Sequence, residues 1–386
     1  MSSMFTVGEC LEAAAKSGRV PGVVATVGNA SGVLYEGAFG ERSVEGHVPM
    51  TNDTVVWIAS MTKAITGAVA MQQVEQGRLS LDAPASDVCP YLGEVQVLDG
   101  FTSEGAPRLR PPKRPVTLRH LLTHSAGFSY EIWNPDYVTY LERTGTPSIF
   151  GCVDKGLEMP LVFDPGDRWE YGINIDWVGK MVEAVTGHDL DTVMRTDLFE
   201  PLGMDSTGFK ISASQRERLA AVHLRGPDGL QHLGFEMPQE PEFWMGGGGL
   251  YSTVGDYLRF TRAILRGGEL DGHRILAADT VAEMSRNNMG SCNVTTLTSV
   301  HPFSNDANFY PGMTQKWGLS FMINTEDTPE GRSAGSLAWA GLANSYYWID
   351  PTKNVTGVMA TQLFPFADTE ALALFKEFES AVYRSL

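Results

Sequence analysis

The chain has 386 residues, 43% of them hydrophobic and 19% charged, and its formal net charge is −17. This composition is typical of a globular protein with a large core, and it excludes an intrinsically disordered chain. The negative charge argues against binding to nucleic acid or to an anionic membrane surface, because phosphate groups would be repelled.

Other global features point to a cytoplasmic protein. No apolar run reaches the length of a membrane span, and the N-terminus lacks the basic segment and long apolar core of a secretory signal. The four cysteines are widely scattered and form no CxxC pair, so we expect free thiols and no disulfide framework. They are Cys10, Cys89, Cys152 and Cys292.

In the first third of the chain, hydrophobic patterning predicts a helix over residues 5–17 and β-rich segments over 22–30 and 32–40. The run WIASMTKAITG, residues 57–67, leads into a helix that extends to about residue 76. Apolar residues occupy both sides of this helix, which predicts burial nearly all round.

The middle of the chain changes character. Residues 100–118 are rich in Pro, Gly and Arg and are typical of a loop. Short helical patterns cover residues 116–127, 176–187 and 191–203, and four glycines at 246–249 form a turn before another amphipathic helix.

The C-terminal third is dense in β-structure, with strand patterns over residues 316–325, 336–341, 344–350 and 355–362. A closing helix places apolar side chains on one face, namely Ala371, Leu374, Phe375, Phe378 and Val382. Strands at both ends with helices between them predict an α/β domain split by a helical insert, with a site in the cleft between the two.

Ser60 and Lys63 form the first candidate for chemistry. Ser60 ends an apolar segment at the start of a helix, where unpaired backbone N–H groups can stabilise negative charge. Lys63 lies three residues later on the same helical face and can act as a base if burial lowers its pKa. The alternative is that Ser60 is an ordinary N-cap.

Two more elements can contribute to such a site. Tyr171, at the entry to a helix, is either a packed aromatic or a base whose phenolate a lysine stabilises. Gly341 ends a predicted strand and permits close backbone approach, so that the N–H of Leu342 can complete an oxyanion hole.

Two other motifs are weaker candidates. Gly331–Gly335 matches the G-x-S-x-G pattern, but a polar loop precedes Ser333 and strand-like sequence follows it, whereas the nucleophile elbow needs a strand before and a helix after. His120 and His124 are spaced like zinc ligands but lack a third ligand, so we interpret them as structural and expect no metal.

The three elements, in this order, resemble the serine β-lactamase and penicillin-binding-protein superfamily, and especially class C β-lactamases and family VIII carboxylesterases. The resemblance extends over residues 5–384 and is supported by the stretches LRHLLTHSAGFSY, FDPGDRWEYG, LFEPLGMDSTGF and GGGGLYSTVGDYLRF. It implies the β-lactamase/DD-peptidase-like fold: an antiparallel sheet flanked by helices, with a discontinuous domain of residues 1–80 and 205–386 and a mostly helical domain of residues 81–204.

The resemblance also implies roles for individual residues. Ser60 is the acylated nucleophile, Lys63 and Tyr171 carry the proton, and Tyr171 is the expected general base, held ionised by Lys63. The N–H groups of Ser60 and Leu342 form the oxyanion hole. Tyr130 resembles a second tyrosine of the esterase branch and is expected to contact substrate or Lys63.

Two departures from the lactamase pattern bear on the substrate. The usual Lys-Thr-Gly element is replaced by Trp339-Ala-Gly341, and the usual Tyr-x-Asn element has Ile173 at its third position, with Asn174 one residue late. Both changes remove polar recognition of an anionic amide and leave an apolar wall. Trp339, Gly341 and Ile173 are therefore expected to contact an uncharged substrate.

These observations predict a serine carboxylesterase that needs no cofactor and acts on short- to medium-chain esters through an acyl-enzyme. Three alternatives remain open: a β-lactamase or peptidase using the same serine, an acyltransferase like the related statin-side-chain enzymes, and a non-catalytic binding module.

Overall fold

An eight-stranded sheet is the centre of the computed structural model, which describes residues 5–386. The strand order is β12-β13-β14-β15-β16-β1-β2-β3, and every neighbouring pair is antiparallel. All residues of the central strands β14, β15, β16 and β1 are buried, because helices cover both faces. The strands are Gly22–Gly28 (β1), Val33–Ser43 (β2), Val48–Pro49 (β3), Gln315–Trp317 (β12), Met322–Asn324 (β13), Leu337–Gly341 (β14), Ser345–Asp350 (β15) and Val355–Ala360 (β16).

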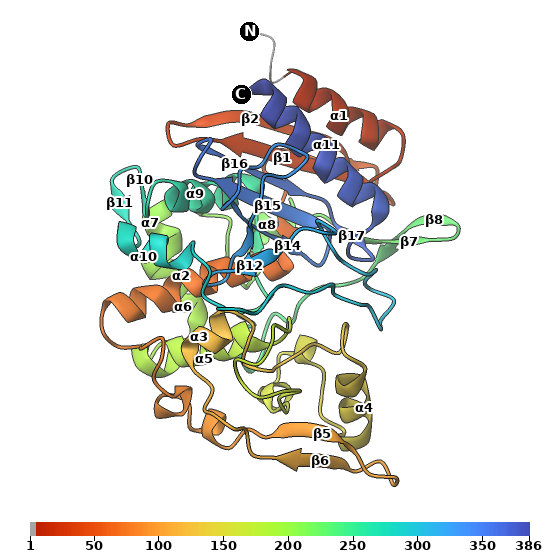
Figure 1. The fold of residues 1–386 in the computed structure, drawn as a ribbon. Helices are drawn as coiled ribbons and strands as arrows, with labels where there is room; N and C mark the ends of the chain where they lie inside the picture. Colours follow the sequence, from red (N-terminus) through yellow and green to blue (C-terminus); the bar gives the residue numbers. More distant parts are fainter. Residues whose placement is uncertain (1–4) are drawn as a thin grey trace.

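Three helices cover the sheet: α1 (Phe5–Lys16), α9 (Val254–Leu265) and α11 (Thr369–Ser385). Helices α1 and α11 pack on each other at one end of the molecule, and α9 contacts β1, β15 and β16 (Figure 1). Helix α11 buries the apolar face that the sequence predicts, and Asp368 caps it by accepting the N–H groups of Glu370 and Ala371.

Helix α2 (Thr62–Glu75) connects the sheet layer to the rest of the molecule. It is buried from Thr62 to Gln73, as its all-round apolar pattern predicts, and contacts α5 and α6. The middle helices are α3 (Leu118–Leu122), α4 (Pro135–Thr144), α5 (Asn174–Thr186), α6 (Leu190–Met194) and α7 (Glu200–Leu202), with a π-helical segment, Arg195–Phe199, between α6 and α7.

The loop predicted over residues 100–118 is wrong in part, because this segment contains strand β6 (Pro107–Arg110), paired with β5 (Val97–Phe101). Strand β6 is half-exposed, and its sequence does not alternate between apolar and polar residues. It is a strand because it pairs with β5, which precedes it in the chain. This hairpin and α4 lie at the end of the molecule opposite α1 and α11 (Figure 1). The predicted domain boundaries stay predictions, and residues 1–4 of the first domain lie outside the described residues.

Short strands and helices complete the fold. The pair β4–β9 aligns Trp57 with Tyr251 and so holds the segment before Ser60 against the chain that follows the four glycines. None of the helices in residues 5–386 has both the length and the hydropathy that a bilayer crossing requires. The remaining strands and α-helices are Val56–Trp57 (β4), Val222–Gly226 (β7), Gly229–Leu233 (β8), Tyr251–Ser252 (β9), Glu269–Leu270 (β10), His273–Arg274 (β11), Leu363–Phe364 (β17), Ala213–Arg216 (α8) and Ala278–Met284 (α10). Short 3₁₀ helices lie at Ala85–Asp87, Pro90–Gly93, Ile149–Gly151 and Asp154–Leu157.

Candidate active site

Ser60 lies in a 3₁₀ turn, Ala59–Met61, directly before α2. The turn is held in place because the Ile58 N–H donates to the Leu250 carbonyl at 3.0 Å, and Ala59 adopts a φ of 45°, which is uncommon for a residue with a Cβ. The N-cap of α2 is Met61, without a side-chain capping bond. Ser60 is therefore not the N-cap of this helix, and its hydroxyl is available for other contacts.

Lys63 is fully buried beneath Ser60 and makes three hydrogen bonds. Its Nζ lies 3.1 Å from Ser60 Oγ, 3.0 Å from Tyr130 OH and 2.5 Å from the Gly247 carbonyl oxygen. Burial lowers the pKa of Lys63, and the negative charge of Asp176 opposes this effect only in part. An amine in this setting loses its proton more readily than an exposed lysine does.

Tyr171 is brought to the same place from the entry to α5. Its hydroxyl accepts a hydrogen bond from Trp339 Nε1 at 2.8 Å, and Lys63 Nζ lies 4.6 Å from the centre of its ring. Burial raises the pKa of Tyr171, whereas hydrogen bonds with Ser60 and Trp339 act to lower it. The structure thus brings Ser60, Lys63, Tyr130 and Tyr171 together from three distant parts of the sequence.

Two groups in this site were not found by sequence reasoning. The first is the Gly247 carbonyl that accepts from Lys63, and the second is Asp176, whose Oδ1 accepts the Gly247 N–H at 2.7 Å. The sequence pattern indicates only a turn for the four glycines at 246–249, and only a helix for Asp176. The signal that the sequence offers for Asp176 is an acidic residue in the first turn of the helix that follows Tyr171.

The glycine loop is fixed against the elements on either side of Ser60. Trp57 Nε1 donates to the Gly248 carbonyl at 2.7 Å, and Thr66 Oγ1 donates to the Gly246 carbonyl at 2.6 Å. A Cβ at position 247 would lie 2.6 Å from Asp176 Oδ2, so only glycine lets the loop approach that carboxylate. The acceptor for Lys63 is therefore held in a fixed position.

The end of β14 meets the turn that carries Ser60. A Cβ on Gly341 would lie 2.4 Å from the Ile58 carbonyl oxygen, so the close approach expected at Gly341 is present. Leu342, the next residue, lines the same small cavity as Ser60. The oxyanion hole formed by the N–H groups of Ser60 and Leu342 stays a prediction with this geometry in its favour.

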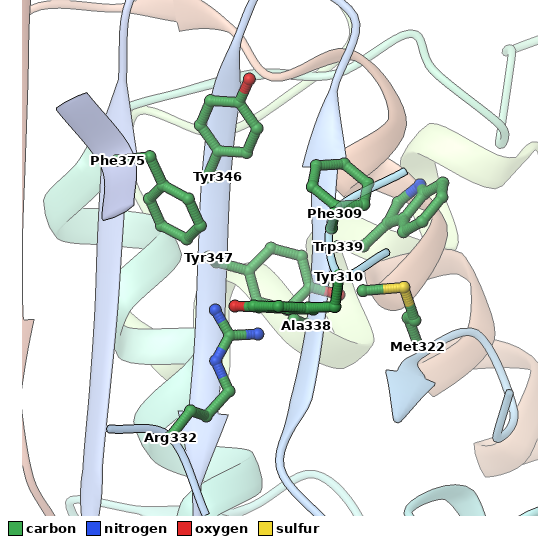
Figure 2. A pocket seen from close by; sticks show the side chains of 9 residues that line it. All are labelled: Phe309, Tyr310, Met322, Arg332, Ala338, Trp339, Tyr346, Tyr347 and Phe375. Carbon is green, nitrogen blue, oxygen red and sulfur yellow. The ribbon is translucent and has the colours of Figure 1, made fainter. Parts of the chain in front are cut away.

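Two expected substrate contacts, Trp339 and Ile173, do not line the Ser60 cavity and stay predictions. Trp339 does not line the Ser60 cavity but packs against Trp317 and Phe309, with ring centres 4.7 and 5.8 Å apart, and faces a separate cavity towards α11 (Figure 2). Ile173 is buried, outside the lining of the Ser60 cavity, and donates its N–H to the Ser129 carbonyl at 3.3 Å.

The aromatic wall of the Ser60 cavity comes from other residues: Trp57, Tyr130, Trp133 and Phe150. Trp339 and Ile173 are expected in this wall because they take the places of the lysine and the asparagine in the lactamase pattern. Trp339 lies on the same face of β14 as Gly341, two residues away, and its indole reaches the Tyr171 hydroxyl instead of the cavity. Ile173 is packed at the entry into α5. Of the expected contacts, Tyr130 alone lines the cavity.

The weaker candidates Ser333 and His124 do not line the Ser60 cavity, although His124 packs on Tyr171 with ring centres 4.7 Å apart. Ser333 lies in the loop between β13 and β14, and its N–H donates to the Asp350 carboxylate. The strand β14, and not a helix, follows it. Asn174 Nδ2 lies 3.0 Å from His124 Nδ1, which places this amide in contact with a buried histidine. The four cysteines are free.

Comparisons with known proteins identify the family. The beta-lactamase family matches residues 7–379. Lovastatin esterase of Penicillium rubens is 32% identical, with 97% of this chain and 96% of the relative covered. Monacolin J acid methylbutanoyltransferase of Aspergillus terreus is also 32% identical, covering 96% and 93% of the two chains.

Solved structures give the same result. Unliganded simvastatin synthase from Aspergillus terreus superimposes with a TM-score of 0.85 at 31% identity, covering 99% of this chain and 98% of that one. EstCE1, described as a hydrolase with promiscuous acyltransferase activity, has a TM-score of 0.78 at 24% identity, covers 98% of both chains and supports the fold alone. The predicted β-lactamase/DD-peptidase-like fold is confirmed, and the chain belongs to the beta-lactamase family as a serine hydrolase or acyl-transferring enzyme.

Proposed function

We propose that the protein hydrolyses uncharged carboxylic esters through an acyl-enzyme on Ser60. The observation that carries this proposal is the contact of Lys63 Nζ with Ser60 Oγ, at 3.1 Å, inside a buried site where the amine is easily neutral. A serine hydroxyl needs such a base, because it is a weak nucleophile by itself.

The hydrogen bonds of Lys63 suit a neutral amine. Such an amine has two N–H groups, which can donate to the Gly247 carbonyl and the Tyr130 hydroxyl, and one lone pair, which can accept the Ser60 proton. When Ser60 Oγ bonds to the ester carbonyl carbon, its proton passes to Lys63 and then to the leaving alcohol. Water attacks the acyl-enzyme in the second step and returns a proton to Ser60 Oγ by the same groups.

Lys63 is favoured over Tyr171 as the first proton acceptor. Burial lowers the pKa of an amine and raises the pKa of a phenol, so the free site favours neutral Lys63 and un-ionised Tyr171. This is opposite to the expectation that Tyr171 is the base. Tyr171 then serves as a hydrogen-bond donor or acceptor to the reacting oxygen atoms, which are Ser60 Oγ and the oxygen of the leaving alcohol.

The substrate is proposed to be an ester without a carboxylate near the scissile bond. Among the described residues, neither the Ser60 cavity nor the cavity beside it is lined by a lysine or an arginine. The similarity to a lovastatin esterase supports an ester substrate. Family VIII membership and a cytoplasmic location belong to the same proposal.

Acyl transfer to an alcohol is the second candidate function. It is favoured by the similarity to Monacolin J acid methylbutanoyltransferase, since the same acyl-enzyme can react with an alcohol instead of water. Product analysis with increasing concentrations of acceptor alcohols separates the two. A transferase converts most of the acyl-enzyme into the new ester, whereas a hydrolase releases mainly the acid.

Substitution of Ser60 tests the nucleophile. We expect Ser60→Ala to lower turnover of p-nitrophenyl butyrate by at least about 10³-fold, and Ser333→Ala, the matched control, to leave turnover largely intact. Mass spectrometry after fluorophosphonate treatment should locate the adduct on Ser60. Loss of turnover in Ser333→Ala with retention in Ser60→Ala would refute the assignment, and faster turnover of nitrocefin than of the ester would favour a β-lactamase.

A further inference from the structure

A second cavity, of about 200 Å³, adjoins the Ser60 cavity. The two share Trp57, Phe150 and Leu342 in their linings, so a group bonded to Ser60 can extend from one into the other. Among these shared residues, only Leu342, the proposed oxyanion donor, has a proposed role in the chemistry.

Most of the second cavity is an aromatic box. Phe235 packs on Trp57 with ring centres 4.7 Å apart, and Phe303 stacks on Phe364 at 5.0 Å. These rings come from four separate segments and contact one another, with Phe235 and Phe364 at 6.0 Å. Mutually packed aromatic rings form stiff walls and favour an apolar body of limited size.

The same cavity has a polar group of three residues: Glu131, Ser148 and His301. Ser148 Oγ donates to Glu131 Oε1, which leaves the second carboxylate oxygen without a protein partner among the described contacts. His301 Nδ1 accepts the Phe303 N–H at 3.3 Å, so the neutral ring carries its proton on Nε2. The cavity thus has an acceptor in Glu131 and a donor in His301.

This pairing selects among polar substituents. A hydroxyl group can pair with either side chain, as a donor to Glu131 or as an acceptor from His301. A carboxylate would meet Glu131 with no lysine or arginine in the described lining to offset the repulsion. A simple alkyl end would leave both polar groups without a partner from the substrate. The lining therefore favours an apolar chain that ends in a hydroxyl.

The second cavity suits the acyl half of the ester better than the alcohol half. The acyl group stays on Ser60 through both chemical steps, while the alcohol must leave and water must enter in its place. Walls of packed aromatic rings next to Leu342 suit the group that stays.

We propose that the second cavity is an acyl-binding subsite that selects medium-length acyl groups carrying a hydroxyl far from the ester and rejects those carrying a carboxylate. This inference rests on the proposed function, because it names the acyl class that Ser60 would take up.

Three p-nitrophenyl esters with matched chains test the subsite: hexanoate, 6-hydroxyhexanoate and the adipate monoester. For the unmodified enzyme we expect kcat/KM for the hydroxy ester to exceed that for hexanoate by about tenfold, the size of one hydrogen bond to a charged group. The adipate ester should be the poorest of the three. In Glu131→Leu the preference for the hydroxy ester should fall to about one.

Glu131→Gln keeps an acceptor and removes the charge, so it should raise kcat/KM for the adipate ester by about tenfold relative to hexanoate. Glu142→Gln, on the exposed face of α4, is the matched control and should leave all ratios unchanged. Because Glu131 also raises the pKa of the neighbouring Tyr130, rates for all esters can change together. The ratios between esters cancel that effect.

Two results would overturn the subsite. One is an unchanged ratio of hydroxy ester to hexanoate in Glu131→Leu while Ser60 still forms the fluorophosphonate adduct. The other is a response to Glu131 only when the hydroxyl is placed on the alcohol half, as in a hydroxyalkyl acetate. Failure of the proposed function is different, since the unmodified enzyme would then hydrolyse none of the esters.

Discussion

Asp176 is the charged group that most directly opposes the effect of burial on Lys63. Its Oδ1 is fixed by the Gly247 N–H, and its Oδ2 is buried without a hydrogen-bond partner in the described part of the chain. Burial raises the pKa of Asp176 and Lys63 lowers it, while Asp176 raises the pKa of Lys63. Each group thus stabilises the charged form of the other.

Asp176→Asn should therefore move the pH dependence of the reaction. Lys63 must be neutral to accept the Ser60 proton, so kcat/KM rises with pH as Lys63 loses its own proton. Removing the negative charge lowers the pKa of Lys63 further, and the acidic limb of the profile should shift to lower pH. The plateau rate should fall by less than about tenfold, because Asn Oδ1 can still accept the Gly247 N–H.

Asp228→Asn, in an exposed turn, is the matched control and should not move this limb. A purely structural role for Asp176 predicts a different outcome, in which rates fall equally at every pH and the limb stays in place. A shift to higher pH would contradict the direction of the interaction.

At the scale of elements, the contact between β14 and the turn before α2 places Leu342 next to Ser60. Gly341→Ala would put a Cβ 2.4 Å from the Ile58 carbonyl oxygen, which forces the strand end and the turn apart. We expect kcat/KM for p-nitrophenyl butyrate to fall by about 10²-fold or more, the cost of losing one oxyanion donor.

The rate of acyl-enzyme formation, followed in a stopped-flow burst, measures this loss directly. Gly32→Ala is the control, because no atom lies within 4 Å of an added Cβ there and its rates should be unchanged. Normal acylation in a folded Gly341→Ala enzyme would remove Leu342 from the proposed oxyanion hole.

At the scale of the whole molecule, a buried ion pair ties the last helix to the sheet. Arg332, in the loop before β14, donates to Glu379 of α11 at 2.9 and 2.6 Å, and both side chains are buried. Arg332 enters the cavity of Figure 2 from the end away from Trp339. Removing one partner would leave the other charge buried without compensation.

Glu379→Gln should accordingly lower the free energy of unfolding by about 3 kcal/mol or more, as measured by urea denaturation. Glu12→Gln removes an exposed i,i+4 pair with Lys16 and should cost no more than about 0.5 kcal/mol. Equal effects of the two substitutions would show that burial of the Arg332 pair does not determine its contribution.

How much of this structure could be predicted from the sequence depends on how local the signal is. The strands around Trp339 and the buried face of α11 carry strong apolar patterns, and the structure contains them. Strand β6 and the π-helical segment after α6 carry no such pattern, because pairing and packing with distant residues determine them. The continuous helix expected over residues 191–203 is therefore interrupted at Arg195–Phe199.

The candidate site divides in the same way. Ser60, Lys63 and Tyr171 could be selected from motif order and family resemblance, without knowing any distance. The hydrogen bond from Trp339 to Tyr171 could not be predicted, since the sequence places Trp339 in a strand but does not show which distant residue its indole meets. Backbone groups such as the Gly247 carbonyl are equally hidden, because every residue has one.

That carbonyl has a consequence for how the enzyme can vary. A side-chain acceptor for Lys63 would disappear with a single codon change, but no codon change removes a main-chain oxygen. A substitution at position 247 is harmful because of its size, since any side chain larger than that of glycine collides with Asp176. Substitution at this position is thus restricted by the volume of the side chain and not by its polarity. Lys63 keeps its main-chain hydrogen-bond partner in every variant that still folds.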